Sequence, residues 1–139
     1  MSQLPPDKLA ETIELWHLVQ EKRSAAETLL SAGLYNDSLS RSYYSAFHAV
    51  TLLFFLQDQS FASHKQAIGN FNKIFIHGDI FPQEIARNLE ALFEARQTGD
   101  YDYHVHFDRD EALEGITKLD IILTAIRQYV VNQFGTALL

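Results

Sequence analysis

The sequence predicts an all-α protein, a helical bundle of about five helices. Apolar residues recur at intervals of three and four along most of the 139 residues, which is the period of an amphipathic helix. Helix caps and stops divide these segments, and alternation of polar with apolar residues occupies only residues 100–108. A chain of this length can bury one core, so we expect a single domain over residues 1–139, frayed at residues 1–6 and 135–139.

The first helix is expected between Asp7 as its N-cap and Gly33 as its stop. The second begins at Asn36 or Asp37, reaches about Gln57 and has a broad apolar surface, which predicts a central position. The apolar positions are Leu9, Ile13, Trp16, Val19, Ala26 and Leu29 in the first helix, and Leu39, Tyr43, Ala46, Phe47, Val50, Leu53 and Phe54 in the second.

A shorter third helix is expected from Ser63 to a turn at residues 77–79, and a fourth has Pro82 in its first turn and ends at Gly99. The residues that share a face are Ala67, Ile68, Phe71, Ile74 and Phe75 in the third helix, and Ile85, Leu89, Leu92 and Phe93 in the fourth.

The last helix is expected to follow Asp108 as its N-cap and to end at Gly135. Its apolar positions alternate steps of four and three, a spacing that packs helices nearly parallel to one another. These positions are Ala112, Ile116, Leu119, Leu123, Ile126 and Val130. Such a face requires a partner, which is either the first helix of the same chain or a second subunit.

The composition excludes several classes of function. The chain has no cysteine, so it has no disulfide, thiolate metal site or cysteine nucleophile. Its formal net charge of −7 opposes general binding to duplex phosphate or to anionic lipid. No signal-peptide pattern and no apolar run of membrane-spanning length occurs, so we expect a cytoplasmic protein without a membrane partner.

Three residues of the second helix, Arg41, Tyr44 and His48, are spaced by three and four and therefore project from one side. Arginine can pair with phosphate, the tyrosine hydroxyl can donate a hydrogen bond, and histidine can exchange a proton near neutral pH. One ligand could contact all three. The alternative is that they are amphipathic residues at the edge of the core.

Arg96 occupies the next step of the apolar stripe in the fourth helix, where another apolar residue is due. A buried guanidinium requires a carboxylate, and Asp100 and Asp102 are the nearest in sequence. Either this pair is structural and fixes the following loop, or Arg96 binds a substrate.

Residues 100–108 alternate with period two, which predicts extended backbone. The side chains expected on the bundle are Tyr101, Tyr103, Val105 and Phe107, and those expected to face outward are Asp100, Asp102, His104 and His106. A row of carboxylates and imidazoles suggests a zinc-type site, but four ligands along a strand would span roughly 20 Å. At most His104, His106 and one remote group could share an ion, and the alternative is a solvated face.

Similarity to a known family lies in three segments, Arg41-Ser42-Tyr43-Tyr44-Ser45-Ala46-Phe47-His48-Ala49, Ser63-His64, and Arg96-Gln97 followed by Asp100-Tyr101. In this order and spacing the chain resembles HEPN-domain proteins, in particular their small stand-alone branch in bacteria and archaea. The likeness extends from about Leu9 to Phe134.

The resemblance implies an up-and-down helical bundle that often forms a homodimer and is frequently encoded beside a minimal nucleotidyltransferase as a toxin and antitoxin pair. It also implies a possible metal-independent ribonuclease that uses an arginine and a nearby histidine. The pairs available here are Arg96 with His104 and Arg41 with His48. Addition of a nucleotide to a tyrosine silences members of the family, which makes Tyr44 a candidate acceptor, and Tyr101 is equally a candidate.

We therefore expect a protein that binds a nucleotide or RNA and uses no cofactor. Arg41 and Arg96 would bind phosphate, and His48 or His104 would transfer protons. The residues expected around this pocket are Arg41, Tyr44, His64, Arg96, Asp100 and Tyr101. A rival hypothesis is a non-catalytic module that binds a second copy or a partner. In this module Arg96 is paired with Asp100 or Asp102 and is not available to a ligand. A third is a metal-binding variant at His104 and His106.

Overall fold

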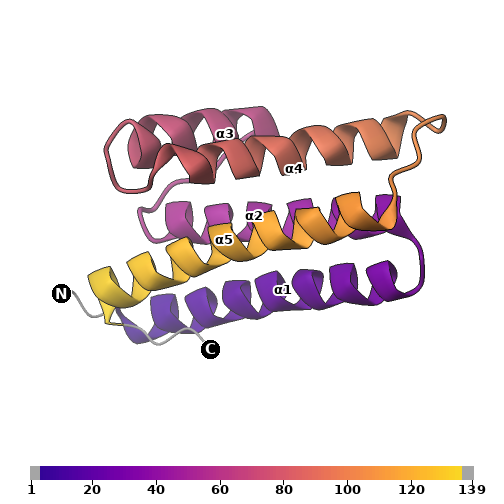
Figure 1. Cartoon of the computed structure of the whole chain (residues 1–139). Helices are drawn as coiled ribbons and strands as arrows, with labels where there is room; N and C mark the ends of the chain where they lie inside the picture. Colours follow the sequence, from indigo (N-terminus) through magenta and orange to yellow (C-terminus); the bar gives the residue numbers. More distant parts are fainter. Residues whose placement is uncertain (1–3, 136–139) are drawn as a thin grey trace.

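The computed structural model describes residues 4–135, which form five α-helices and one π-helical turn and contain no strand. The helices are α1 (Pro6–Ser31), α2 (Tyr35–Phe55), α3 (His64–Phe71), the π turn η1 (Asn72–Ile76), α4 (Gln83–Tyr101) and α5 (Arg109–Phe134). The four long helices run up and down beside one another (Figure 1). The predicted all-α bundle is therefore confirmed.

The expectations for the chain ends fall partly within this range. Pro6 already begins α1, and Gly135 is the C-cap residue of α5. The expected fraying of residues 1–3 and 136–139 lies outside the described residues.

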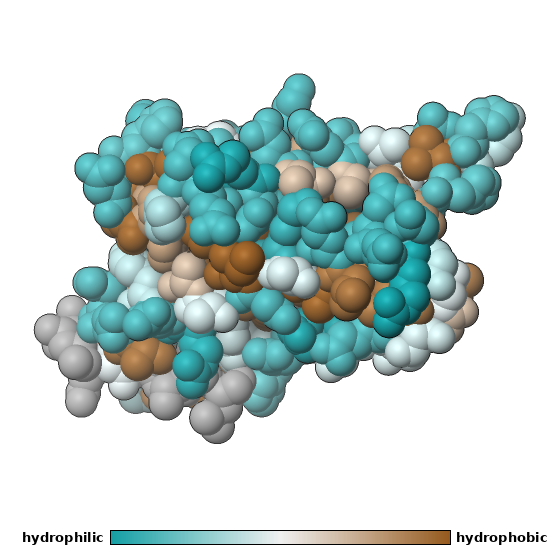
Figure 2. Space-filling view, in the orientation of Figure 1, coloured by the Kyte–Doolittle hydropathy of each residue, from teal (hydrophilic) through white to brown (hydrophobic). Residues whose placement is uncertain are grey.

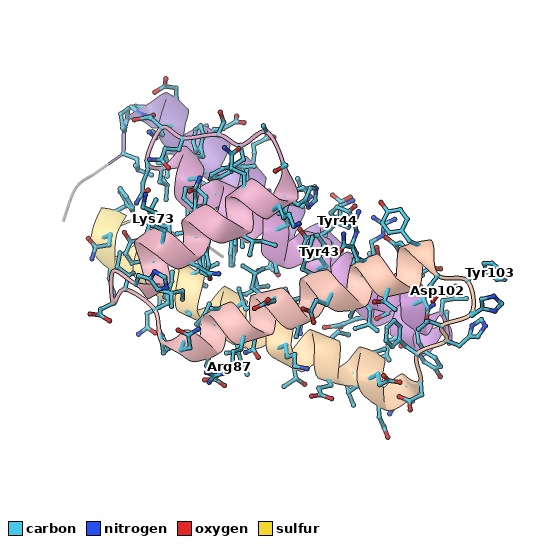
Figure 3. The ribbon with its side chains drawn as sticks, turned by 90° about the horizontal axis from the view of Figure 1, so that it is seen from above. Tyr43, Tyr44, Lys73, Arg87, Asp102 and Tyr103 are labelled. Atoms are coloured by element: carbon cyan, nitrogen blue, oxygen red, sulfur yellow. The ribbon has the colours of Figure 1, made fainter. Side chains whose placement is uncertain are left out.

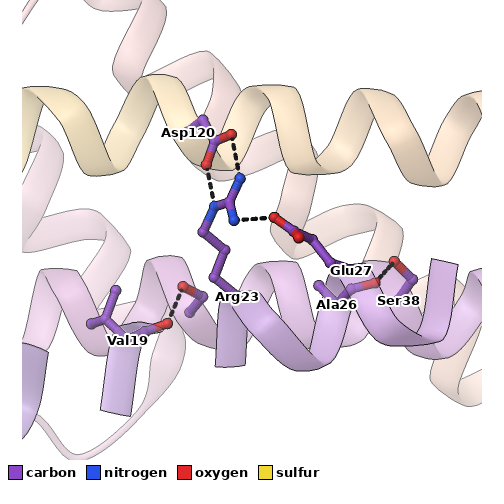
Figure 4. Close-up of polar contacts among 7 residues, drawn as sticks. Val19, Arg23, Ala26, Glu27, Ser38 and Asp120 are labelled. Atoms are coloured by element: carbon purple, nitrogen blue, oxygen red, sulfur yellow. Dashed lines mark hydrogen bonds and ion pairs between the residues drawn. The ribbon is translucent and has the colours of Figure 1, made fainter. Parts of the chain in front are cut away.

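The second helix is central, as predicted, because α2 contacts α1, α3, α4 and α5. Small hydroxyl residues let α1 approach it closely. The Ser38 hydroxyl donates to the Ala26 carbonyl oxygen and the Ser45 hydroxyl to the Val19 carbonyl oxygen, each at 2.8 Å (Figure 4). These bonds satisfy buried hydroxyl groups with backbone of the neighbouring helix.

The predicted apolar face of α5 is fully buried, with exposed fractions of 6 % or less at all six positions. Helix α5 contacts mainly α2 and α4 of the same chain and α1 less, so the expectation that the first helix would be its partner holds only in part. The contact of α5 with α1 includes an ion pair. Arg23 of α1 donates to both carboxylate oxygens of Asp120, at 2.6 and 2.8 Å, and also pairs with Glu27 (Figure 4).

Three predicted helix ends are confirmed. The Ser63 hydroxyl accepts from the Gln66 backbone N–H and caps α3. Asp108 caps α5 in a reciprocal pair with Glu111, in which each side chain accepts from the backbone N–H of the other. Gly135 ends α5 with a positive φ of 65°, a conformation that suits glycine.

Other predicted ends are displaced. Helix α1 begins at Pro6, because the fixed φ of proline suits the first helical position, and Asp7 lies in the first turn instead of at the cap. Helix α2 begins at Tyr35, so Asn36 is inside the helix and its side chain is free for another role. Pro82 holds the N-cap position of α4.

The predicted extended segment at residues 100–108 was wrong in its first part. Helix α4 continues through Gly99 to Tyr101, and a hydrogen bond from the Asp102 N–H to the Thr98 carbonyl oxygen closes the last turn. A helical Gly99 is tolerated here because it leaves room for the ring of Phe107, which would lie 3.1 Å from a Cβ at this position.

The expected inward and outward alternation of this segment holds only in its second half. Val105 and Phe107 are half-buried against the bundle. Tyr101 and Tyr103 are 74 % and 82 % exposed, which contradicts their predicted place on the core. A turn at residues 103–104 interrupts the alternation, since period two holds only in straight extended backbone.

Candidate functional site

Arg96 lies within a cluster of aromatic and polar side chains from α2, from the start of α3 and from the end of α4. This Arg96 cluster consists of Tyr43, Tyr44, His64, Arg96, Asp100 and Tyr101. The guanidinium carbon lies over three tyrosine rings, 5.6 Å from the centroid of Tyr43, 5.2 Å from Tyr44 and 5.6 Å from Tyr101. Figure 3 shows Tyr43 and Tyr44 between α3 and the C-terminal half of α4. Arg96 is thus fixed by cation–π contacts on several sides.

The polar contacts of Arg96 use part of its guanidinium group. One terminal nitrogen donates to the Tyr44 hydroxyl at 2.8 Å, and Nε lies 3.3 Å from a carboxylate oxygen of Asp100. Nε is buried and makes no hydrogen bond of good geometry with that carboxylate, so the contact is an ion pair without directional bonding. The Ser40 hydroxyl lies 3.4 Å from the same Asp100 oxygen. The second terminal nitrogen makes no hydrogen bond or ion pair with any residue of the described range 4–135, so it can donate to a ligand.

His64 at the start of α3 is held by two aromatic residues of α2. Its Nδ1 lies 2.5 Å from the Tyr43 hydroxyl oxygen, and its ring stacks on Phe47 with the centroids 4.1 Å apart. Burial lowers the pKa of His64 from its ordinary value, and the Arg96 cation lowers it further. His64 is therefore a neutral imidazole near pH 7.

The tautomer of His64 follows from Tyr43, whose side chain is fully buried. Burial raises the pKa of the Tyr43 hydroxyl well above its ordinary value, so it remains a protonated phenol. A buried hydroxyl requires an acceptor, and Nδ1 of His64 is the one in reach. We therefore assign the imidazole proton to Nε2. In this state His64 offers a ligand a hydrogen-bond donor.

Five of the predicted site residues meet in the Arg96 cluster: Tyr44, His64, Arg96, Asp100 and Tyr101. Arg96 pairs with Asp100, and the carboxylate of Asp102 instead accepts from the backbone N–H of His104.

The other three predicted residues lie around the cluster or apart from it. Arg41 is exposed on α2 one turn before Tyr44 and makes no contact with the cluster among the described residues. His48 is half-buried one turn after Tyr44, and burial, then the charge of Lys22, lowers its pKa. His104 is exposed in the loop after α4, where its ring lies beside that of Tyr103, with the centroids 4.1 Å apart and the ring planes tilted by 35°.

Two residues with a role at this site were not predicted. Tyr43 was counted as an apolar core position, and the periodicity gives no signal for the hydroxyl that binds His64. Asn36 was expected to cap α2, but its side-chain N–H donates to the Val105 carbonyl oxygen at 2.8 Å and its oxygen accepts from the Phe107 N–H at 2.9 Å. This pair of bonds, here called the Asn36 clamp, attaches the loop at residues 102–108 to α2.

Residues 4–135 contain no group of three or more His, Asp or Glu side chains that could hold a metal ion. Among the helices described, none has the length and apolar character needed to cross a membrane.

The Arg96 cluster lies within the part of the chain that matches a known domain family. The HEPN domain family matches residues 19–129. A UPF0332 protein from Thermotoga maritima is 29 % identical over 85 % of this chain and 90 % of its own length. A protein from Methanocaldococcus jannaschii that carries the name "Putative toxin" is 26 % identical over 88 % of this chain and 84 % of its own length. A further UPF0332 protein, from Pyrococcus horikoshii, is 31 % identical over 60 % of this chain and 57 % of its own length.

Proposed function

Because this chain belongs to the HEPN domain family, we propose that it is a toxin-type HEPN protein that binds RNA through a phosphate group held at the Arg96 cluster. The toxin role is supported by the name of the Methanocaldococcus relative, whose alignment covers most of both chains. The observation that carries the phosphate site is the position of Arg96. Its guanidinium is fixed by three tyrosines, and one terminal nitrogen makes no hydrogen bond or ion pair with the described residues.

The chemistry of the cluster suits an anion. Arg96 supplies charge and a planar fork of donors, and His64 supplies an uncharged N–H donor from Nε2. Both donors are held by other side chains before a ligand arrives, so little ordering is required on binding. A phosphodiester with two unesterified oxygens can accept from both groups.

Cleavage without a metal would require a proton acceptor for the ribose 2′-hydroxyl group. In the tautomer assigned above, Nδ1 of His64 is occupied by Tyr43, so His64 acts as a donor to phosphate. His48 and His104 remain candidates for proton transfer.

The first test measures binding and cleavage of a labelled single-stranded RNA in the presence of a chelator. We expect His64→Ala to weaken binding about tenfold, because a hydrogen bond to a charged phosphate contributes about 1.5–3 kcal/mol. His17→Ala is the control for binding, since it removes an exposed histidine of α1 that lies outside the Arg96 cluster. Equal binding by wild-type and His64→Ala protein would exclude His64 from the site. Loss of cleavage in His48→Ala or His104→Ala alone would identify the catalytic histidine.

A second candidate function is a non-catalytic interaction module. It is favoured by the Arg96–Asp100 ion pair, which neutralises the site, and by an apolar groove of about 530 Å³ between the start of α4 and α5. Figure 2 shows apolar side chains gathered in a band across the face on which α4 and α5 lie. Exposed Ile121 lines this groove. In this second candidate function, a second copy of the chain binds there and covers Ile121. Absence of RNA binding in every form of the protein would favour this function.

We further propose a minimal nucleotidyltransferase as the partner, with Tyr101 as its acceptor. In such a transfer the Tyr101 oxygen attacks the α-phosphorus of ATP, the bond to pyrophosphate breaks, and the phenolic proton passes to a base of the partner. Two observations favour Tyr101 over Tyr44: its ring is 74 % exposed, whereas the Tyr44 hydroxyl is half-buried and already accepts from Arg96.

The test incubates this protein with the purified nucleotidyltransferase and labelled ATP, and locates the added mass by peptide mass spectrometry. We expect Tyr101→Phe to lose at least nine-tenths of the label, an order-of-magnitude loss that reflects one acceptor hydroxyl. Tyr103→Phe is the matched control, because Tyr103 is as exposed but does not contact Arg96. Label retained by Tyr101→Phe and lost by Tyr44→Phe would assign the acceptor to Tyr44 instead.

A further inference from the structure

Two tyrosines at the edge of the Arg96 cluster are exposed to solvent: Tyr101, which belongs to the cluster, and Tyr103, which follows it in the loop. Tyr101 and Tyr103 are 74 % and 82 % exposed, more than any other large apolar side chain in the described part of the chain. Figure 3 shows Tyr103 at the far tip of the loop after α4. The ring of Tyr103 lies beside that of His104, with the centroids 4.1 Å apart and the ring planes tilted by 35°. Such exposed aromatic faces are unusual on a folded protein and indicate a binding surface.

The loop that carries Tyr103 is fixed to the bundle. The Asn36 clamp holds its second half, and the Asp102 carboxylate accepts from the His104 N–H at 3.0 Å. The Val105 N–H donates to the Asp102 carbonyl oxygen, and Asp108 caps the next helix. The tyrosines are therefore presented on a backbone that is already ordered, which reduces the entropy lost when they bind.

The two exposed tyrosine rings lie next to the proposed phosphate site at Arg96. The Tyr101 ring lies 5.6 Å from the guanidinium carbon of Arg96, and Tyr103 follows two residues later. A nucleotide has an anionic phosphate and a flat base with two π faces, so Arg96 and an adjacent ring match its two ends. Aromatic side chains bind unpaired bases by stacking, whereas bases in a duplex are stacked on each other and cannot reach them.

Charge at the loop favours stacking over phosphate contact. Residues 97–108 contain no lysine or arginine. Asp100 is paired with Arg96, and Asp102 is engaged by the backbone of its own loop. These carboxylates disfavour the dense phosphate of a duplex. The tip can therefore add affinity for a base face but not for a phosphate backbone.

We propose that Tyr101 and Tyr103 form a stacking platform for unpaired bases of the RNA strand whose phosphate is bound at Arg96. This inference rests on the proposed function, and it names single-stranded RNA as the ligand class. The base next to the phosphate bound at Arg96 stacks on Tyr101, and the following base stacks on Tyr103.

The test uses a single-stranded RNA that contains 2-aminopurine, whose fluorescence is quenched when its base stacks. With wild-type protein we expect quenching and tight binding. Tyr103→Ala is expected to bind about tenfold more weakly and to lose part of the quenching. Tyr103→Phe keeps the ring and should behave as wild type. Ile80→Ala removes an exposed apolar side chain from the turn before α4 and serves as the control.

Three outcomes would overturn the proposal. Equal affinity and quenching with Tyr103→Ala, while wild-type protein binds the RNA, would reject the platform and leave the proposed function intact. Binding of a duplex of the same sequence as tightly as the single strand would reject it as well. A Tyr103→Ala chain that loses a protein partner but keeps RNA would assign the loop to protein docking. If wild-type protein binds no RNA, the proposed function itself fails.

The salt dependence separates the two parts of the site. The loss caused by Tyr103→Ala should be the same at low and high salt, because stacking involves no phosphate charge. A loss that disappears at high salt would show that the loop acts through charge, and would contradict stacking.

Discussion

An Arg96→Ala chain is expected to bind single-stranded RNA about ten- to a hundredfold more weakly than the wild-type chain. Arg96 supplies the cationic donor of the proposed site, and a charge-assisted contact of this kind contributes about 1.5–3 kcal/mol. The measurement is fluorescence anisotropy of a labelled RNA at two salt concentrations. The difference between the two chains should shrink at high salt, since salt screens the interaction of Arg96 with phosphate.

Two variants control for effects of charge and folding. Arg87→Ala removes an exposed arginine of the same helix, which lies away from Tyr43 and Tyr44 in Figure 3. It changes the net charge by the same amount and should keep the affinity. Arg96→Lys keeps the charge but loses the planar fork, so an intermediate affinity is expected. If Arg96→Ala and Arg87→Ala lose affinity equally, the effect is one of net charge, and the phosphate does not lie at Arg96.

Arg96 also has a structural role, which requires a check of stability. The side chain is only 12 % exposed and contacts three tyrosine rings and Asp100. Its removal leaves Asp100 without its cation and creates space beside Tyr44. Affinity is therefore compared only between chains with the same helical signal at the assay temperature.

The helices could be predicted because each apolar face repeats over several turns. The six apolar positions of α5 are all buried, and the caps at Ser63 and Asp108 form as the residue types indicate. The partner of α5 could not be predicted, because spacing shows that a face is apolar but not which neighbour covers it. The extended segment failed because alternation over residues 100–108 does not distinguish a strand from a helix end followed by a turn.

The site residues could be predicted where a charged residue interrupts the apolar periodicity of a helix. Arg96 interrupts an apolar stripe, and Asp100 is the carboxylate one turn away, as the buried charge requires. His64 is separated from Arg96 by most of α3 and α4, so the contact depends on how these helices pack on α2. The Tyr43 hydroxyl could not be predicted, because a tyrosine at a core position carries the same periodic signal as a phenylalanine.

Phe75→Ala is expected to destabilise the protein by about 3–5 kcal/mol, a large part of the roughly 5–15 kcal/mol of a typical domain. Phe75 lies in the π turn η1 and is completely buried. Its ring lies within 6 Å, centroid to centroid, of four others: Phe54 at 5.6 Å, Phe71 at 5.5 Å, Phe81 at 5.7 Å and Tyr129 at 5.9 Å. These rings join α2, α3, α5 and the turn before α4, so truncation opens a cavity that several elements share.

The measurement is the midpoint of urea unfolding, followed by circular dichroism. Phe75→Leu should lose less than half as much free energy of unfolding, because leucine fills most of the volume. Phe55→Ala truncates a half-buried ring at the end of α2 and should cost less than Phe75→Ala. The π turn that contains Phe75 lies away from the Arg96 cluster, as the position of Lys73 relative to Tyr43 and Tyr44 shows in Figure 3. The RNA affinity of the folded Phe75→Ala protein should therefore equal that of the wild type. A Phe75→Ala chain with an unchanged midpoint would show that this aromatic cluster does not hold the end of the bundle together. A chain that keeps its folded signal but loses RNA would show instead that the π turn and the Arg96 cluster are coupled.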